Sequence, residues 1–122
     1  MNARILTVDD SASIRLTTKV TLSNAGYEIT EAVHGAEGLE KAKSGQFDLI
    51  VTDLNMPVMD GLTMIEELRK LPAHTGVPII FLTTESDADL KARAKAAGAT
   101  GWLTKPFDPE HLVKIVKKVL GR

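Results

Sequence analysis

Hydrophobic residues gather in three short runs, in which apolar side chains follow one another without alternating with polar ones. The runs cover residues 4–8, 47–52 and 77–83, and they are rich in β-branched residues. Such a pattern predicts parallel strands that are covered on both faces. Two weaker strands are expected at residues 27–31 and 101–103. The pattern therefore predicts five strands, with helical segments between them.

The helix expected near the end of the chain has the clearest signals. Asp108 is a suitable N-cap, and Pro109 fits the first helical position. Apolar residues then recur at helical spacing, at Leu112, Ile115, Val116 and Val119. This spacing predicts a helix that packs one face inward.

Two other helices have recognisable ends. Ser86 and Asp89 have the spacing of a capping box, and they precede an Ala-rich stretch that Gly98 would end. Gly61 precedes a further helix, which the segment 71–78 should stop because it contains two prolines and a glycine.

The first helix has two faces with apolar residues. Leu16 and Val20 fall on the face that is predicted to point outward, where they could form a docking patch. Isolated apolar residues are common on protein surfaces, so the alternative is that Leu16 and Val20 are exposed without binding anything. The opposite face is predicted to pack inward and holds Ile14, Thr18, Leu22 and Ala25.

Strands that alternate with helices over short connections predict an α/β fold. Because each crossover should be right-handed, the sheet is expected to be parallel with helices on both faces. In such sheets ligands bind beyond the carboxyl ends of the strands, where the strand order reverses. Polar residues follow four of the five predicted strands, namely Asp9 and Asp10, Asp53, Thr83 and Thr84, and Lys105.

Each of these polar residues has an ordinary explanation by itself, as a helix cap, a turn residue or a solvated lysine. Together they indicate a site that binds a cation and reacts with a phosphoryl group. Three carboxylates about 4 Å apart would repel one another by about 4 kcal/mol per pair at an effective dielectric of 20. Mg²⁺ would compensate this repulsion, since it prefers oxygen ligands, and Lys105 would add a second positive charge. A carboxylate beside Mg²⁺, a lysine and a hydroxyl can attack a phosphorus centre.

Composition and charge exclude several classes of protein. The chain has 15 basic and 16 acidic residues, and its net charge of −1 argues against an extended nucleic-acid surface. It has no cysteine, which excludes disulfides and thiolate metal sites. The first residues form neither a signal peptide nor a membrane span. We therefore expect one cytoplasmic domain over residues 1–122.

Four motifs carry a resemblance to a known family. They are VDDS at 8–11, VTDLNMPVMDG at 51–61, LTTE at 82–85 and WLTKPF at 102–107. Taken in this order, they resemble the receiver domain of two-component response regulators, and most closely the single-domain chemotaxis (CheY-like) type. The resemblance implies a flavodoxin-like, doubly wound five-stranded parallel sheet of order 2-1-3-4-5 with five helices.

The resemblance also implies the catalytic and metal-binding residues. Asp53 would accept a phosphoryl group, Lys105 would pair with Asp53 and then with a phosphoryl oxygen, and Thr83 would hydrogen-bond another. The cofactor Mg²⁺ would be held by Asp10 directly, by Asp9 largely through water, by Asp53, and by the backbone carbonyl of Asn55.

Further positions are implied to control how long the signal lasts and how it is transmitted. Thr83 and an aromatic residue form the family's switch, and here Trp102 stands where Tyr or Phe is usual. An indole is larger and has an N–H to satisfy, so the coupling is expected to differ. Lys105–Pro106 resembles the family's cis peptide. Asn55 and Glu85 occupy the positions that tune dephosphorylation.

The implied function is that of a single-domain response regulator in a phosphorelay. A sensor histidine kinase of the chemotaxis type, or a histidine phosphotransfer protein, would donate the phosphoryl group. The output would pass to a protein effector such as the flagellar motor switch, through a face formed by residues 87–120. The protein would act as a monomer, without nucleic acid or membrane insertion. It would not be an enzyme beyond catalysing its own phosphorylation and dephosphorylation.

Several alternatives stay open or are weak. A relay intermediate or a phosphate sink is possible on the same residues. A small phosphatase with an aspartyl nucleophile is remote, because the acid pair of such enzymes follows the first strand. A flavodoxin-like cofactor protein is disfavoured because Asp9 and Asp10 would repel its phosphate, and a dinucleotide motif is absent. The three histidines, His34, His74 and His111, are interpreted as surface or helix residues.

Overall fold

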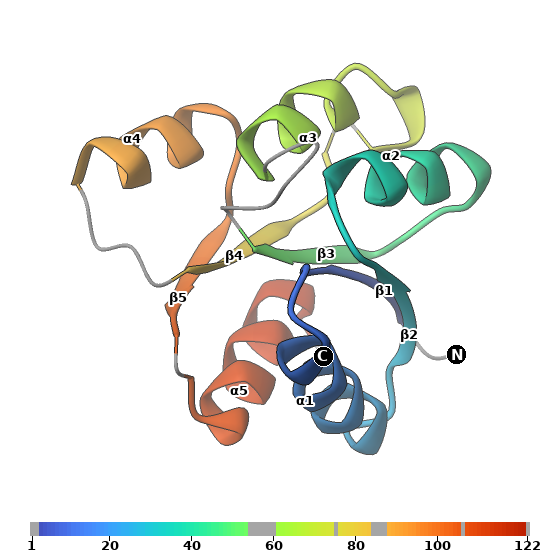
Figure 1. The fold of residues 1–122 in the computed structure, drawn as a ribbon, viewed down its shortest axis with the longest axis vertical. Coiled ribbons are helices and arrows are strands. Elements are labelled where there is room, and N and C mark those ends of the chain that lie inside the picture. Colours follow the sequence, from blue (N-terminus) through green and yellow to red (C-terminus); the bar gives the residue numbers. More distant parts are fainter. Residues whose placement is uncertain (1–2, 54–60, 75, 84–87, 106, 122) are drawn as a thin grey trace.

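The computed structural model describes residues 3–53, 61–74, 76–83, 88–105 and 107–121. They form a five-stranded parallel sheet of order β2-β1-β3-β4-β5 with helices on both sides (Figure 1). This confirms the predicted fold class and strand order. The strands are β1 (Arg4–Val8), β2 (Glu28–Ala32), β3 (Leu49–Asp53), β4 (Ile79–Thr83) and β5 (Gly101–Thr104).

Five α-helices and one short 3₁₀ helix connect the strands among the described residues. They are α1 (Ala12–Asn24), α2 (Gly35–Ser44), α3 (Gly61–Leu68), η1 (Pro72–His74), α4 (Ala88–Ala96) and α5 (Pro109–Leu120). Within these ranges no helix combines the length and the apolar character that a membrane span requires. The predicted strands agree with the observed ones to within two residues at each end.

The sheet separates two hydrophobic cores. Helices α2, α3 and α4 cover one face, and α1 and α5 cover the other (Figure 1). Successive side chains of a strand point to opposite faces, so Leu6 contributes to the first core and its neighbour Ile5 to the second. Strand β3 is buried at every position, as expected for the centre of a doubly covered parallel sheet. Both faces of the sheet are therefore held rigidly.

The two helices on the same face, α1 and α5, follow the predicted patterns. Asp108 caps α5 by accepting from the Glu110 amide, and Leu112 and Val116 are buried. In α1 the buried residues are Thr18 and Leu22, whereas Leu16 on the outer face is 61% exposed. The inward and outward faces are thus those that the sequence predicts.

Arg69 ties together three parts of the chain at the amino edge of β4. Its guanidinium donates to the backbone carbonyls of His74 at 3.0 Å, Val77 at 2.8 Å and Gly98 at 2.7 Å. Gly98 has φ +106°, and a Cβ there would lie 2.8 Å from Arg69 Nε. The predicted helix stop at Gly98 therefore also makes room for this side chain.

The interpretation of His74 as a surface or helix residue is wrong about its exposure. His74 ends the short helix η1, but its side chain is completely buried and lies against Phe47, with ring centroids 6.3 Å apart. Among the described residues neither ring nitrogen has a hydrogen-bond partner. Burial lowers the pKa of His74 because the charged imidazolium loses its hydration. The packing of the α3–β4 connection, which the sequence pattern does not reveal, causes this burial.

His74 should make the protein less stable as the pH falls. Its pKa is lower in the folded state, so the unfolded chain binds more protons below the ordinary histidine pKa of about 6.5. The contribution of His74 is fully present above that value and is lost below it, by at most about 1.4 kcal/mol per pH unit. Urea unfolding at pH 7.5 and 5.5 should show a smaller loss for His74→Leu than for the wild type. His111→Gln, at an exposed position of α5, should keep the wild-type loss, and an equal loss in His74→Leu would contradict the prediction.

Candidate functional site

The first and third strands bring two acidic residues together at the carboxyl edge of the sheet. Val8 of β1 pairs with Thr52 of β3, so Asp9 and Asp53 come next at neighbouring positions. The strand order reverses between β1 and β3, which is where ligands bind in doubly wound sheets. Asp9 is 3% exposed and Asp53 is 8% exposed. Two buried carboxylates therefore lie side by side at this edge.

Lys105 reaches these carboxylates from the end of β5. Its Nζ lies 2.8 Å from Asp9 Oδ2 and 3.4 Å from Asp53 Oδ2. The lysine side chain is 11% exposed, so the contacts lie largely out of water. The family resemblance implies that Lys105 pairs with Asp53, and the structure adds Asp9 as the nearer partner. A buried ammonium between two carboxylates relieves part of their repulsion.

Asp10 completes a cluster of three acids. Carboxylate oxygens of Asp9, Asp10 and Asp53 all lie within 4.8 Å of one another, and Asp10 is exposed. Three carboxylates and the Lys105 ammonium leave a formal charge of −2 at this site. Two oxygens on opposite sides of Mg²⁺ lie about 4.2 Å apart, since each bond is about 2.1 Å long. The oxygen donors, their spacing and their charge therefore fit a divalent cation.

The two acids after β1 do not cap α1, which differs from the ordinary explanation considered for them. Ser11 is the N-cap, and its Oγ accepts from the Ile14 amide at 3.4 Å. Asp9 Oδ1 instead accepts from the Ser11 amide at 2.9 Å, which closes a turn between strand and helix. One carboxylate oxygen of Asp9 thus fixes the turn, and the other contacts Lys105.

Arg15 is a contact of the site that sequence reasoning missed. From α1, its Nη1 donates to the backbone carbonyl of Asp9 at 2.8 Å. The sequence gives no sign of this contact, because the carbonyl that an arginine side chain reaches depends on the path of the chain around its helix.

Several predicted site residues lie outside the described part of the chain. This holds for Asn55, Glu85 and Pro106, so the backbone carbonyl ligand, the dephosphorylation position and the cis peptide stay predictions. Thr83 ends β4 in register with Thr104, which puts its backbone at the same edge of the sheet as Asp53. The structure does not describe the side chain of Thr83, so its predicted role stays a prediction.

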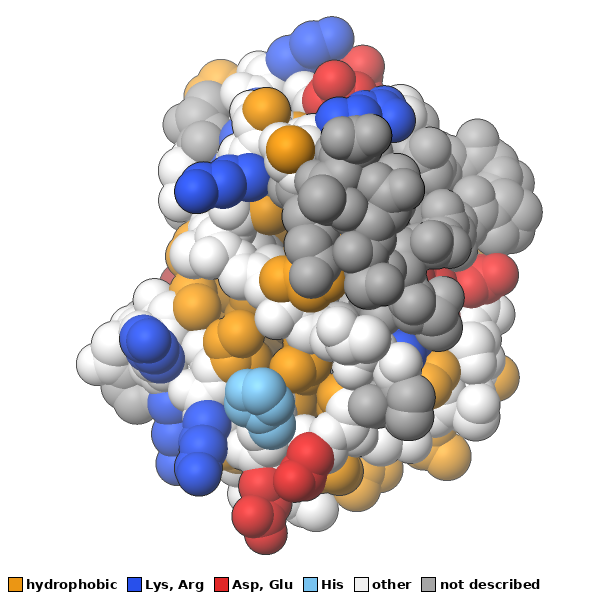
Figure 2. Space-filling view, turned by 90° about the vertical axis from the view of Figure 1, so that its left-hand side faces the viewer, with side chains coloured by type: hydrophobic (Ala, Val, Ile, Leu, Met, Phe, Trp, Pro, Cys, Tyr) orange, Lys and Arg blue, Asp and Glu red, His pale blue; other side chains and the backbone are white. Residues whose placement is uncertain are grey.

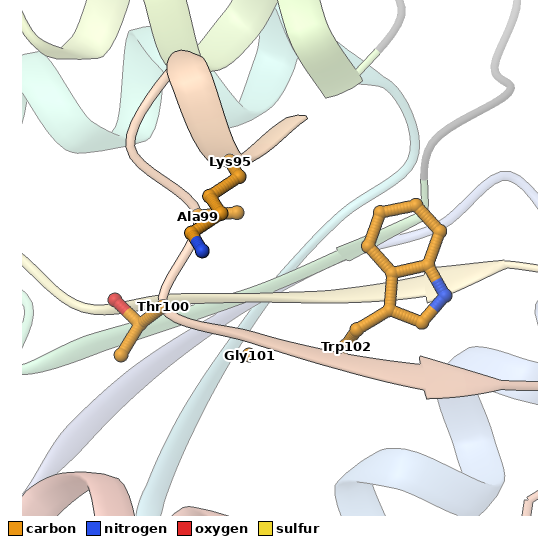
Figure 3. A pocket seen from close by; sticks show the side chains of 5 residues that line it. All are labelled: Lys95, Ala99, Thr100, Gly101 and Trp102. Carbon is orange, nitrogen blue, oxygen red and sulfur yellow. The ribbon is translucent and has the colours of Figure 1, made fainter. Parts of the chain in front are cut away.

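Trp102 lies on β5, partly buried against the core. Its ring and that of Phe81 are tilted by 54°, with centroids 5.7 Å apart. Figure 3 shows the side chains of Trp102 and Lys95 on the α4 side of β5. They border a pocket of about 440 Å³, which is lined by Lys95, Ala99, Thr100, Gly101 and Trp102. The aromatic residue predicted to switch therefore packs on the core and also borders an open pocket.

The side of the molecule that carries α4, β5 and α5 has a mixed surface. Figure 2 shows hydrophobic side chains near the middle of the view, Lys and Arg side chains along the left border and at the top, and Asp and Glu side chains at the top, the right and the bottom. In α5 the exposed lysines are Lys114, Lys117 and Lys118, and in α4 Arg93 and Lys95 are exposed. This side therefore combines apolar and basic side chains with the exposed acids Asp108 and Glu110 near the start of α5.

Comparisons with known proteins match nearly the whole chain. Chemotaxis protein CheY1 of Helicobacter pylori is 38% identical over 120 residues, which cover 97% of each chain. The structure of chemotaxis protein CheY4 of Vibrio cholerae is 46% identical with a TM-score of 0.94, and the match covers 98% of this chain and 99% of that one.

A second solved structure is the receiver domain of the sensor histidine kinase PA1611 of Pseudomonas aeruginosa, which holds a magnesium ion in its active-site cleft. It is 28% identical with a TM-score of 0.91, over all of both chains. Several curated relatives are longer proteins, among them transcriptional regulators of which this chain spans 48 to 58%.

The family model that matches is that of the response regulator receiver domain, over residues 5–117. The fold, the strand order and the acidic cluster at the strand ends agree with this match. The chain belongs to the response regulator receiver domain family.

Proposed function

We propose that this chain, as one receiver domain over residues 1–122, accepts a phosphoryl group on Asp53 in a Mg²⁺-dependent reaction and signals by binding a protein partner. The observation that carries the proposal is the cluster of Asp9, Asp10 and Asp53, with Lys105 in contact with Asp9 and Asp53. A cytoplasmic location stays part of the proposal.

In the proposed reaction a carboxylate oxygen of Asp53 attacks the phosphorus atom of the donor. An O–P bond forms, and the bond from phosphorus to the leaving nitrogen of a phosphohistidine, or to the leaving oxygen of acetyl phosphate, breaks. Lys105 lies 3.4 Å from Asp53 and can neutralise charge on the transferring oxygens. Thr83 is proposed to hydrogen-bond another of these oxygens.

Asp9 and Asp10 are proposed to hold the cation, with Asp53 and the backbone carbonyl of Asn55. When bound, Mg²⁺ supplies positive charge that offsets the charge of the transferring group. Asp10 is suited to bind the cation directly, because its side chain is exposed to the water from which the cation arrives. The buried Asp9 has one oxygen on Lys105 and the other on the Ser11 amide, which supports an indirect role through water.

The chain is proposed to act as a signalling domain that catalyses only its own phosphorylation and its loss. The sensor kinase or phosphotransfer protein would deliver the group, and the α4–β5–α5 side would carry the output to a partner such as the flagellar motor switch. The likeness to CheY1 and CheY4 supports a role in chemotaxis. A relay intermediate or a phosphate sink is the second candidate, and the role of Trp102 as a switch stays a prediction.

We also propose that a histidine-bearing helix of the phosphoryl donor docks on the apolar patch that Leu16 and Val20 form on α1. Val20 is 48% exposed, and Leu16 lies one turn before it. Val20 also borders a groove of about 270 Å³ between α1 and α5, which is lined by Val20, Thr21, Asn24, Pro109, Glu110 and Val113. The apolar side chains of this surface suit the apolar face of a helix; they are Leu16, Val20, Pro109 and Val113.

Asp53→Asn should abolish labelling by radioactive acetyl phosphate in the presence of Mg²⁺, because the amide is not a nucleophile. The measurement is the incorporated label per mole of protein after separation from the donor. Asp48→Asn, at an exposed acid just before β3, is the matched control and should label like the wild type. Equal labelling of Asp53→Asn and the wild type would refute the assignment of the phosphoacceptor.

Asp10→Asn should weaken Mg²⁺ binding by more than about tenfold, which is the loss typical even of groups outside the first coordination shell. Without Mg²⁺ the same change should raise the urea midpoint, since it removes one of three mutually repelling charges. Calorimetric Mg²⁺ titration and urea unfolding measure the two effects. A lower midpoint together with unchanged Mg²⁺ affinity would show that Asp10 has a structural role instead.

Val20→Asp should slow phosphoryl transfer from the cognate kinase at least severalfold, because the docking helix would meet a charge. It should spare labelling by acetyl phosphate, which needs no docking surface. Gln46→Asp adds the same charge at an exposed position of the α2–β3 connection and serves as the control. If Val20→Asp lost both reactions equally, the docking proposal would be wrong.

A further inference from the structure

Arg15 holds the peptide group that joins the two acids after β1. Its Nη1 donates to the Asp9 carbonyl at 2.8 Å, and the arginine side chain is 18% exposed. That carbonyl belongs to the planar peptide unit between Asp9 and Asp10. Fixing its direction also fixes the direction in which the backbone enters Asp10.

Asp9 is held from several sides, whereas Asp10 is not. The Asp9 amide donates to the Ala32 carbonyl at 3.1 Å, and its carboxylate contacts Ser11 and Lys105. For the Asp10 carboxylate, the described part of the chain offers neither a hydrogen bond nor an ion pair. The position of Asp10 in the cluster therefore depends on its backbone. The Asp9 carboxylate restrains the peptide unit after Asp10 through the Ser11 amide, and Arg15 restrains the peptide unit before it.

Glu31 on β2 keeps the guanidinium in place. Arg15 Nε lies 3.8 Å from Glu31 Oε1, and Lys19 Nζ lies 3.4 Å from Glu31 Oε2. Lys41 donates to the Glu31 backbone carbonyl. In this arrangement the positive charge of Arg15 is paired with Glu31, and its second contact is with a neutral carbonyl rather than with the carboxylates of the cluster.

We propose that Arg15 is a positioning residue for the metal ligand Asp10, acting through the Asp9–Asp10 peptide. The inference rests on the proposed Mg²⁺ site and adds a residue to it. Arg15 would not touch the cation or the phosphoryl group. Its hydrogen bond would hold Asp10 where its carboxylate can meet those of Asp9 and Asp53.

Replacing Arg15 should change the Mg²⁺ affinity in opposite directions, depending on whether Arg15 acts through its charge or through its hydrogen bond. Removing a positive charge near a cation site strengthens Mg²⁺ binding, because the repulsion between the two cations disappears. Losing the hydrogen bond weakens it, because the ligand is no longer held. The sign of the change in Mg²⁺ affinity therefore distinguishes the two.

The test compares Arg15→Met with Lys19→Met by calorimetric titration of the full chain with MgCl₂, without a phosphoryl donor. Both changes remove one positive charge from α1 and one partner of Glu31, but only Arg15→Met removes the bond to the Asp9 carbonyl. Arg15→Met should weaken Mg²⁺ binding by about tenfold relative to Lys19→Met. Arg15→Lys should recover part of this loss, because one donor remains.

The second readout is the backbone amide signal of Asp10 in the Mg²⁺-free protein, measured by NMR. It should shift in Arg15→Met and stay in place in Lys19→Met. Equal or tighter Mg²⁺ binding by Arg15→Met than by Lys19→Met, or an Asp10 signal unchanged in both, would overturn the inference alone. A wild-type chain that takes up no Mg²⁺ would instead overturn the proposed function, and this inference with it.

Discussion

Three carboxylates repel one another at the carboxyl edge of the sheet, and the fold holds them together. Asp9, Asp10 and Asp53 have oxygens within 4.8 Å of one another, and two of these acids are buried. Such a cluster persists only where packing elsewhere offsets its cost and where positive charge lies close. Lys105 provides one such charge, and the remaining formal charge of −2 matches a divalent cation.

The offsetting stability comes from a sheet with a core on each face. β3, which ends in Asp53, is buried throughout and lies between β1 and β4. Because both faces are packed, the ends of β1 and β3 cannot move apart to relieve the repulsion. The same rigidity brings Lys105 from the end of β5 to Asp9, across 96 positions of sequence. The packing of the two hydrophobic cores thus offsets the repulsion between the carboxylates, although the core residues take no part in the chemistry of the site.

At the amino end of β4, a single positively charged side chain again holds several parts of the chain together. Arg69 joins η1, the start of β4 and the turn after α4 through three carbonyls, and Gly98 leaves space for it. His74 is buried beside this connection. Gly98, whose carbonyl accepts from Arg69, directly precedes residues that line the pocket near Trp102. Arg69 is therefore bonded to one end of the side that we propose to carry the output.

The sequence by itself determined the alternation of strands and helices, the inward and outward faces of α1 and α5, and the polar residues that follow the strands. These features could be predicted because periodicity and residue type act locally and a parallel sheet brings its carboxyl ends to one edge. Only the tertiary structure decided that His74 is buried and that Lys105 meets Asp9 more closely than Asp53. It also decided that Arg15 meets the Asp9 carbonyl. These outcomes depend on distances between side chains that are set by how strands and helices pack, and a pattern along one chain carries no such distances.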